Sequence, residues 1–168
     1  MIALGSLFGR QSAPMLGIDI SSSSVKLVEL GRDKAGTLVL ERCAVEQLER
    51  GWITDGNIEK FDEVAEALRR LVKKSGTRTK HVALALPSSA VITKRITLPG
   101  GLSEQELEVQ VESEANQYIP FSLDEVSLDF CVIGPNKSAP GDVDVLIAAS
   151  RKEKVQDRQG LAEAAGLK

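Results

Sequence analysis

Apolar and polar residues alternate in three successive runs near the start of the chain, at residues 16–20, 25–30 and 37–48. Alternation with a period of two is typical of half-buried β-strands. Four consecutive serines separate the first two runs, and a turn with glycine at both ends, residues 31–36, separates the second from the third. Because such short polar connections join antiparallel neighbours, the pattern predicts a three-stranded meander.

A helix and a buried strand follow the meander. Residues 58–75 have apolar side chains at helical spacing on one face. These are Phe61, Val64, Ala65, Leu68, Leu71 and Val72. Asn57 is a candidate N-cap for this helix, and Gly76 suits its C-terminal end. The apolar run at residues 81–86 predicts a short, fully buried strand. A helix between strands allows this last strand to run parallel to residues 16–20 through a crossover.

A second unit begins at Pro87. Alternation at residues 91–98 predicts a half-exposed strand, and the spacing of Ser103 and Glu106 is that of a capping box at a helix start. Pro120 ends this helix. Its apolar stripe consists of Leu107, Val111, Ala115 and Tyr118.

Two further strands and a third helix complete the pattern. Residues 126–133 and 143–147 alternate as strands do. Ser150 and Glu153 repeat the capping-box spacing and predict a helix that ends at Gly166. Since such a helix normally leads to another element, either it is the natural end or the chain is part of something longer.

Composition narrows the class of protein. Of 168 residues, 42% are apolar, 27% are charged and only 4% are aromatic, so aliphatic side chains must form the core of a soluble α/β protein. Lys and Arg number 21 against 24 Asp and Glu, a balance that gives no basic surface for nucleic acid. Cys43 and Cys131 fall in expected strands and are interpreted as reduced, buried thiols. With His81 as the single histidine, histidine-based triads and zinc sites are disfavoured.

No apolar run approaches the roughly 20 residues that a membrane-spanning helix needs. Residues 1–14 contain scattered apolar positions and a single Arg10, which is not the pattern of a signal peptide. We interpret this segment as a flexible tail. A short stretch that docks on a membrane or partner is the alternative.

The serine turn is the strongest candidate for a binding site. Ser21, Ser22, Ser23 and Ser24 can offer backbone amides and hydroxyls to an anion, and Lys26 can add a positive charge. Asp19 would repel a phosphate, so its role would be to hold a metal ion or the water around it. An ordinary hairpin with a polar tip is the competing interpretation.

This stretch resembles the first phosphate loop of the superfamily of actin, Hsp70 and sugar kinases, in which a strand ending in Asp and a Gly-Ser or Gly-Thr turn precede a Lys. Ser21 stands where that pattern commonly has a glycine. The resemblance implies ATP with Mg²⁺ as the cofactor, bound between two lobes.

A closer resemblance is to the PilM family of type IV pilus assembly proteins, which are actin-like and related to the division protein FtsA. Residues 114–121 carry it, together with residues 17–20, 24–27, 90–94, 125–126 and 129–130. It implies an actin-like or ribonuclease H-like lobe with an inserted FtsA-like subdomain of one small sheet and one helix. The lobe would comprise residues 15–88 and 151–168, and the insertion residues 89–150.

The family resemblance also implies a function. PilM is a cytoplasmic scaffold at the face of the inner membrane that binds the N-terminal cytoplasmic tail of PilN. Self-association is a further interaction that this function allows. Tyr118, Ile119 and Phe121 are the candidate partner-binding residues, although they could instead close the core of the insertion. Family members are considerably longer, so Asp19, the four serines and Lys26 would form half a nucleotide site. We therefore expect this chain alone to be inactive as an ATPase and to lack bound ATP.

Two other functions remain open at this point. A small-molecule kinase of the actin superfamily would need a general base and a substrate pocket, and no convincing base follows residue 30. A secretion-platform subunit similar to GspL would share the fold without using nucleotide.

Overall fold

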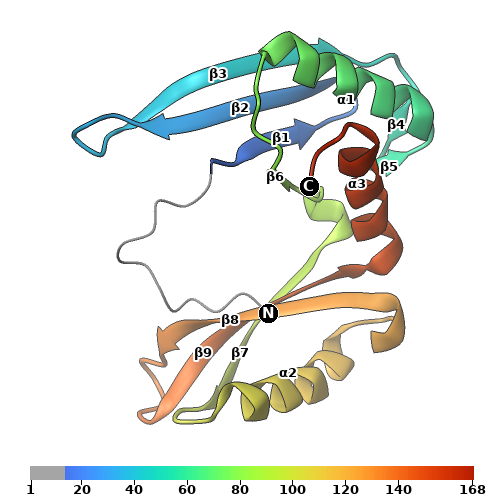
Figure 1. Ribbon diagram of the computed structural model, residues 1–168. Helices are drawn as coiled ribbons and strands as arrows, with labels where there is room; N and C mark the ends of the chain where they lie inside the picture. The colour runs from blue at the N-terminus through green and yellow to red at the C-terminus, as the bar shows by residue number, and fades with distance from the viewer. Residues whose placement is uncertain (1–13) are drawn as a thin grey trace. The chain divides into compact units, whose positions relative to one another are not determined.

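The computed structural model describes residues 14–168, which have a mixed α/β architecture as predicted (Figure 1). The expected tail, residues 1–14, lies outside the described residues except for its last position. The described chain forms two compact units. Unit 1 comprises residues 14–54, Ile58–Ala85 and Gly160–Lys168, and unit 2 comprises Asp55–Asn57 and Leu86–Gln159.

Unit 1 is built on the predicted meander. β1 (Leu16–Ile20), β2 (Ser24–Arg32) and β3 (Leu38–Gln47) pair antiparallel, and β6 (Val82–Leu84) pairs parallel with β1, giving the order β3-β2-β1-β6. The crossover prediction is therefore confirmed. The strand β6 is only partly buried, because it forms the edge of this sheet.

One face of this sheet makes the main core. Its side chains alternate in register, so that Leu16, Ile18, Val25 and Leu27 all point to the side covered by α1 (Phe61–Ser75). From the helix, Val64, Leu68 and Leu71 fill the same cluster, joined by Leu161 and Ala162 from the C-terminal part of unit 1. Burial of these aliphatic groups provides the main driving force for folding of unit 1.

The start of α1 differs from the prediction. Asn57 does not cap it; Asn57–Ile58 forms β5, which pairs with β4 (Ile53–Thr54) in a short hairpin. The helix begins after Lys60, which makes no side-chain capping bond. The Asp-Gly dipeptide at residues 55–56 explains this, since both residues have positive φ and form a tight hairpin turn.

Unit 2 contains a three-stranded antiparallel sheet and a helix. β7 (Ile92–Pro99) and β8 (Val126–Pro135) are the outer strands, and β9 (Asp142–Arg151) lies between them. Two 3₁₀ turns, Ser88–Ala90 and Leu123–Glu125, precede β7 and β8.

The helix α2 (Glu104–Tyr118) covers one face of this sheet. Ser103 and Glu106 form the predicted capping box, in which Glu106 accepts from the Ser103 amide at 2.8 Å. Val111 and Ala115 are buried against the sheet, as predicted. Tyr118 is not part of the buried stripe: it is 43% exposed at the last turn of the helix.

The second predicted capping box is wrong. α3 (Lys152–Ala164) begins after Ser150, which is the penultimate residue of β9. The hydroxyl of Ser150 donates to the carbonyl of Ala90 at 2.7 Å, so a tertiary contact takes the group that would otherwise cap the helix. Residues 152–159 of α3 belong to unit 2 and the remainder to unit 1.

The prediction of two buried thiols is also wrong. Cys43 pairs with Val28 on the face of unit 1 opposite α1, and Cys131 lies on the face of unit 2 opposite α2. Both strands are edge strands, and both thiols are free and exposed. Sequence alternation identified the strands but could not say which face the helices would cover.

Candidate functional site

A pocket of about 300 Å³ lies within unit 2. Four segments meet there: residues 55–57 (the Asp55–Gly56 turn and the first residue of β5, together called the 55–57 turn), the 3₁₀ turn before β7, the chain after α2, and the β9–α3 junction. The lining residues are Asp55, Gly56, Asn57, Ser89, Ala90, Ile92, Ile119, Phe121, Val126, Ala149, Ser150, Arg151 and Lys154.

The floor of the pocket is apolar. Ile92 and Ala149 are paired across β7 and β9, and both contribute to a small cluster with Ile119 and Val126. Ile119 follows α2 with an extended backbone and is buried against Ala115, Val126 and Ala149. This floor can accommodate aliphatic side chains, since apolar surface gains free energy when it leaves water.

The rim of the pocket is polar and charged. Asp55 and Lys154 line it with opposite charges. Arg151 lies with its guanidinium 5.3 Å from the centre of the Phe121 ring and 3.4 Å from a Glu153 carboxylate oxygen. An apolar floor with polar groups at the edge is suited to a short extended peptide, whose side chains enter the pocket while its backbone bonds to the rim.

The three predicted partner-binding residues separate into two environments. Ile119 and Phe121 both line the pocket. Tyr118 does not; its ring is exposed and lies 4.5 Å from the ammonium group of Lys94. Their role in binding stays a prediction, in which Ile119 and Phe121 can contact a ligand in the pocket and Tyr118 cannot contact it from inside the pocket.

The serine turn has the geometry of a closed hairpin loop. Both the amide and the hydroxyl of Ser21 donate to the carbonyl of Ser24, at 3.0 and 2.9 Å. Ser24 is buried, so Ser22 and Ser23 are the exposed members of the turn. Of the four serines, these two are therefore the ones available to an anion.

Asp19 and Lys26 are cross-strand neighbours beside this turn. Their side chains form an ion pair at 2.9 Å. The Asp19 side chain is 60% exposed and the Lys26 side chain is 50% exposed. Such exposed pairs contribute about 0–1 kcal/mol, so a ligand can separate them at low cost. Within residues 14–168, no group of three His, Cys, Asp or Glu side chains is arranged to hold a metal ion.

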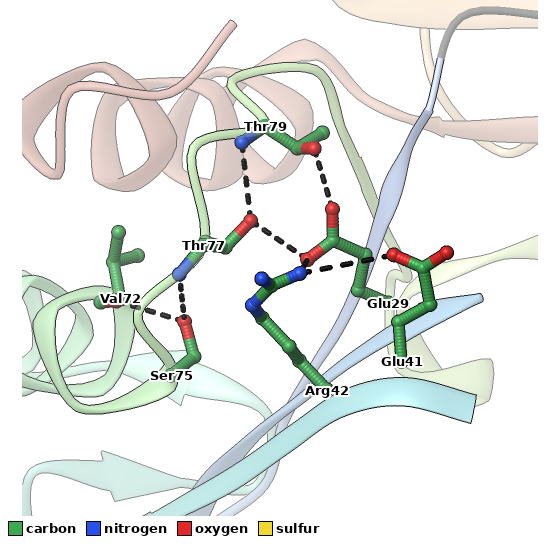
Figure 2. A network of polar contacts seen from close by, with 7 residues as sticks. All are labelled: Glu29, Glu41, Arg42, Val72, Ser75, Thr77 and Thr79. Carbon is green, nitrogen blue, oxygen red and sulfur yellow. Dashed lines mark hydrogen bonds and ion pairs between the residues drawn. The ribbon is translucent and has the colours of Figure 1, made fainter. Parts of the chain in front are cut away.

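A buried carboxylate in unit 1 escaped the sequence reasoning. Figure 2 shows Glu29 of β2 accepting from the hydroxyls of Thr79 at 2.6 Å and Thr77 at 2.9 Å, and from the Arg42 guanidinium at 3.1 Å. Only 6% of the Glu29 side chain is exposed. The Thr79 bond, with those of Thr77 and Arg42, holds the pKa of Glu29 below its ordinary value although burial opposes this. Glu29 lies in the alternating run at residues 25–30, a pattern that predicts a strand but not a buried carboxylate.

Other pocket residues were also missed. Asp55 and Gly56 were not predicted as part of a site, although an Asp-Gly dipeptide is a strong hairpin signal. Arg151 and Lys154 carried no sequence signal beyond their charge. Among the described residues, no helix is both long enough and apolar enough to span a bilayer.

Comparison with known proteins gives a consistent result. The family described as "Type IV pilus assembly protein PilM" matches residues 17–168. A solved structure described as "PilM-PilN type IV pilus biogenesis complex" superposes with a TM-score of 0.80 and 32% sequence identity. The match covers 91% of this chain and 45% of that one, so this chain spans less than half the length of the chain it matches.

A second solved structure, "Structure of diol dehydratase-reactivating factor in nucleotide free form", is far more distant. Its sequence is 17% identical to this chain, and the two superpose with a TM-score of 0.31 over 76% of this chain and 17% of that chain. The fold of residues 14–168 matches a fragment of the actin-like fold of the PilM structure, as predicted.

Proposed function

The chain belongs to the PilM family of type IV pilus assembly proteins, and we propose that it acts as a scaffold that binds the N-terminal cytoplasmic tail of PilN in the unit 2 pocket. A match to a PilM-PilN complex at 32% identity supports PilN as the partner. Binding a membrane protein's cytoplasmic tail would hold this chain at the cytoplasmic face of the inner membrane.

The pocket itself is the observation that carries this proposal. Its volume of about 300 Å³ is at the lower end of the range for ligand pockets, about 300–1,000 Å³. It therefore suits a few side chains of an extended segment rather than a whole helix. Its apolar floor and charged rim would select a peptide with apolar anchors and an otherwise polar backbone face.

Titration calorimetry tests the proposal. We expect a synthetic peptide of the PilN N-terminal tail to bind the 168-residue chain with a one-to-one, saturable isotherm, and a scrambled peptide of the same composition to give none. Equal heats from the two peptides, or no heat from either, would refute peptide capture.

We further propose that the serine turn supplies one side of a nucleotide site in longer family members. Lys26 and the exposed Ser22 and Ser23 would face the phosphates, and Asp19 would hold the water shell of Mg²⁺ once Lys26 turns to the nucleotide. When bound, Mg²⁺ would neutralise phosphate charge. The remaining contacts would come from a second lobe, in keeping with the greater length of the matched PilM chain.

A prediction for this chain alone follows from the one-sided geometry. We expect Mg-ATP to show no saturable binding to the 168-residue chain below about 1 mM, because few contacts and no enclosure leave at most a few kcal/mol of binding free energy. Fluorescence titration with a labelled ATP analogue measures this. Micromolar affinity that Lys26→Met abolishes would show that the half-site suffices on its own.

The two other interpretations have distinct signatures. Phosphoryl transfer to a small acceptor by the longer protein would favour a kinase of the actin superfamily. Tail binding that is indifferent to nucleotide and to Asp19→Ala in the longer protein would favour a platform subunit of the GspL type. Self-association is tested by sedimentation with and without the tail peptide.

A further inference from the structure

A buried arginine near the pocket has too few partners. Arg158 of α3 is only 6% exposed. One Nη donates to the carbonyl of Gly56 at 3.2 Å, while Nε has no hydrogen-bond partner among the described residues. Burial lowers the pKa of Arg158, against the opposing effect of the neighbouring Asp157. Since burying a cation without a carboxylate partner is costly, the single bond that it makes requires an explanation.

The group that Arg158 holds is a wall of the pocket. Gly56 is the middle residue of the 55–57 turn, and all three turn residues line the pocket. Asp55 and Gly56 have φ values of 51° and 81°, in the left-handed region. The strands flanking the turn have two residues each, and so short a hairpin is not stable by itself. Ile53 and Ile58 hold the two strands against the main core of unit 1, so only the turn residues themselves depend on contacts within unit 2.

The turn also packs closely against the start of the segment that leads to β7. A Cβ placed on Gly56 would lie 2.8 Å from the Pro87 ring and 3.6 Å from the hydroxyl of Ser89. Ser89 is itself a lining residue. Gly56 thus packs closely against Pro87 and accepts through its carbonyl from the guanidinium of Arg158.

We propose that Arg158 is a positioning residue for the pocket: its bond to the Gly56 carbonyl fixes the 55–57 turn as a wall against which the bound peptide lies. The expected effect of Arg158 on peptide affinity rests on the proposed peptide-capture function. The contact between Arg158 and Gly56 does not depend on that function. Arg158 does not line the pocket, so its effect on affinity is transmitted through the turn.

Two measurements on the full 168-residue chain test the role of Arg158. In Arg158→Met, which keeps the length of the side chain but removes its donors, we expect hydrogen exchange at residues 55–57 to rise about tenfold, as a lost bond from a charged donor implies. Exchange in α2 and β9 should stay unchanged. Affinity for the PilN tail peptide should fall by a similar factor, and Arg158→Lys should restore part of both.

Controls separate this role from general stability and from the function itself. Arg95→Met removes an exposed arginine of the same unit and should change neither readout. If Arg158→Met fails to fold, Gly56→Ala moves the turn directly and should weaken tail binding. Unchanged exchange at residues 55–57, or exchange raised equally throughout unit 2, overturns the positioning role. If the unmodified chain does not bind the tail, peptide capture fails while the exchange result still decides the role of Arg158.

Discussion

Phe121→Ala should weaken binding of the PilN tail peptide by about tenfold or more, since an aromatic anchor in a pocket typically contributes about 2 kcal/mol to affinity. Phe121 lines the pocket with its ring below the guanidinium of Arg151. The ring is also 40% exposed, so its removal should cost little folding free energy. Calorimetric titration of the variant measures the affinity, and thermal unfolding checks that the fold is intact.

Tyr118→Ala is the matched control. Tyr118 is an aromatic residue with an exposed fraction similar to that of Phe121, and its ring likewise lies below a cation, the ammonium group of Lys94. Unlike Phe121, it does not line the pocket. The account predicts that its truncation leaves tail affinity within about a factor of two, the range of neutral interface positions. Equal losses of affinity in the two variants would place the binding surface on the exposed side of the α2 C-terminus, outside the pocket. A loss of affinity in Tyr118→Ala alone would contradict the pocket assignment.

Glu29→Ala should lower the free energy of unfolding by about 2–4 kcal/mol, because hydrogen bonds to a charged group contribute about 1.5–3 kcal/mol each and their partners would be left unpaired. The hydroxyls of Thr77 and Thr79 would lose their acceptor, and both lie in the segment that joins α1 to β6. The ion pair with the half-exposed Arg42 should add little. Urea denaturation followed by circular dichroism measures the change.

The control for this substitution is Glu41→Ala. Glu41 is an exposed carboxylate of β3 that lies 3.7 Å from the same guanidinium. Its removal should change stability by no more than about 0.5 kcal/mol, as is usual for exposed positions. A cost for Glu29→Ala as small as that for Glu41→Ala would mean that the network in Figure 2 does not hold the segment.

The contribution of Glu29 should also depend on pH. Its pKa is lowered in the folded state, chiefly by the Thr79 hydroxyl, from an ordinary value of 4.5. Its stabilising effect is therefore complete above the unfolded pKa and is lost as pH falls through the folded pKa. The stability difference between the parent chain and Glu29→Gln should be constant from neutral pH to about 5.5 and shrink below about 4.5. A difference that grows on acidification would show that folding raises the pKa of this carboxyl instead of lowering it.

Local sequence signals predicted much of the fold. The amphipathic pattern of residues 58–75, placed between two strands, indicated a crossover that allows β6 to run parallel to β1, which is the arrangement found. The Ser103 capping box was correct because all its groups come from one helix turn. Ser150 shows the limit of such reasoning: the same spacing failed there because the Ala90 carbonyl, distant in sequence, takes its hydroxyl.

The candidate site was predictable only in part. Tyr118, Ile119 and Phe121 were predicted together as partner-binding residues, yet the sequence could not separate Tyr118 from the other two, since that depends on how the chain continues after the helix. The 55–57 turn and Arg158 come together only in the folded unit and share no local motif. The buried Glu29 was hidden for a similar reason, as its partners lie nearly fifty residues further along the chain.

The most direct test is to locate the peptide on the protein by nuclear magnetic resonance. With the 168-residue chain labelled with ¹⁵N and titrated with the PilN tail peptide, the account predicts amide shift changes concentrated at the pocket, including Ser89, Ile92 and Ala149. The serine turn and the exposed strand β3 should be unaffected. Shift changes centred on β3 or the serine turn, with the pocket amides unmoved, would contradict the account.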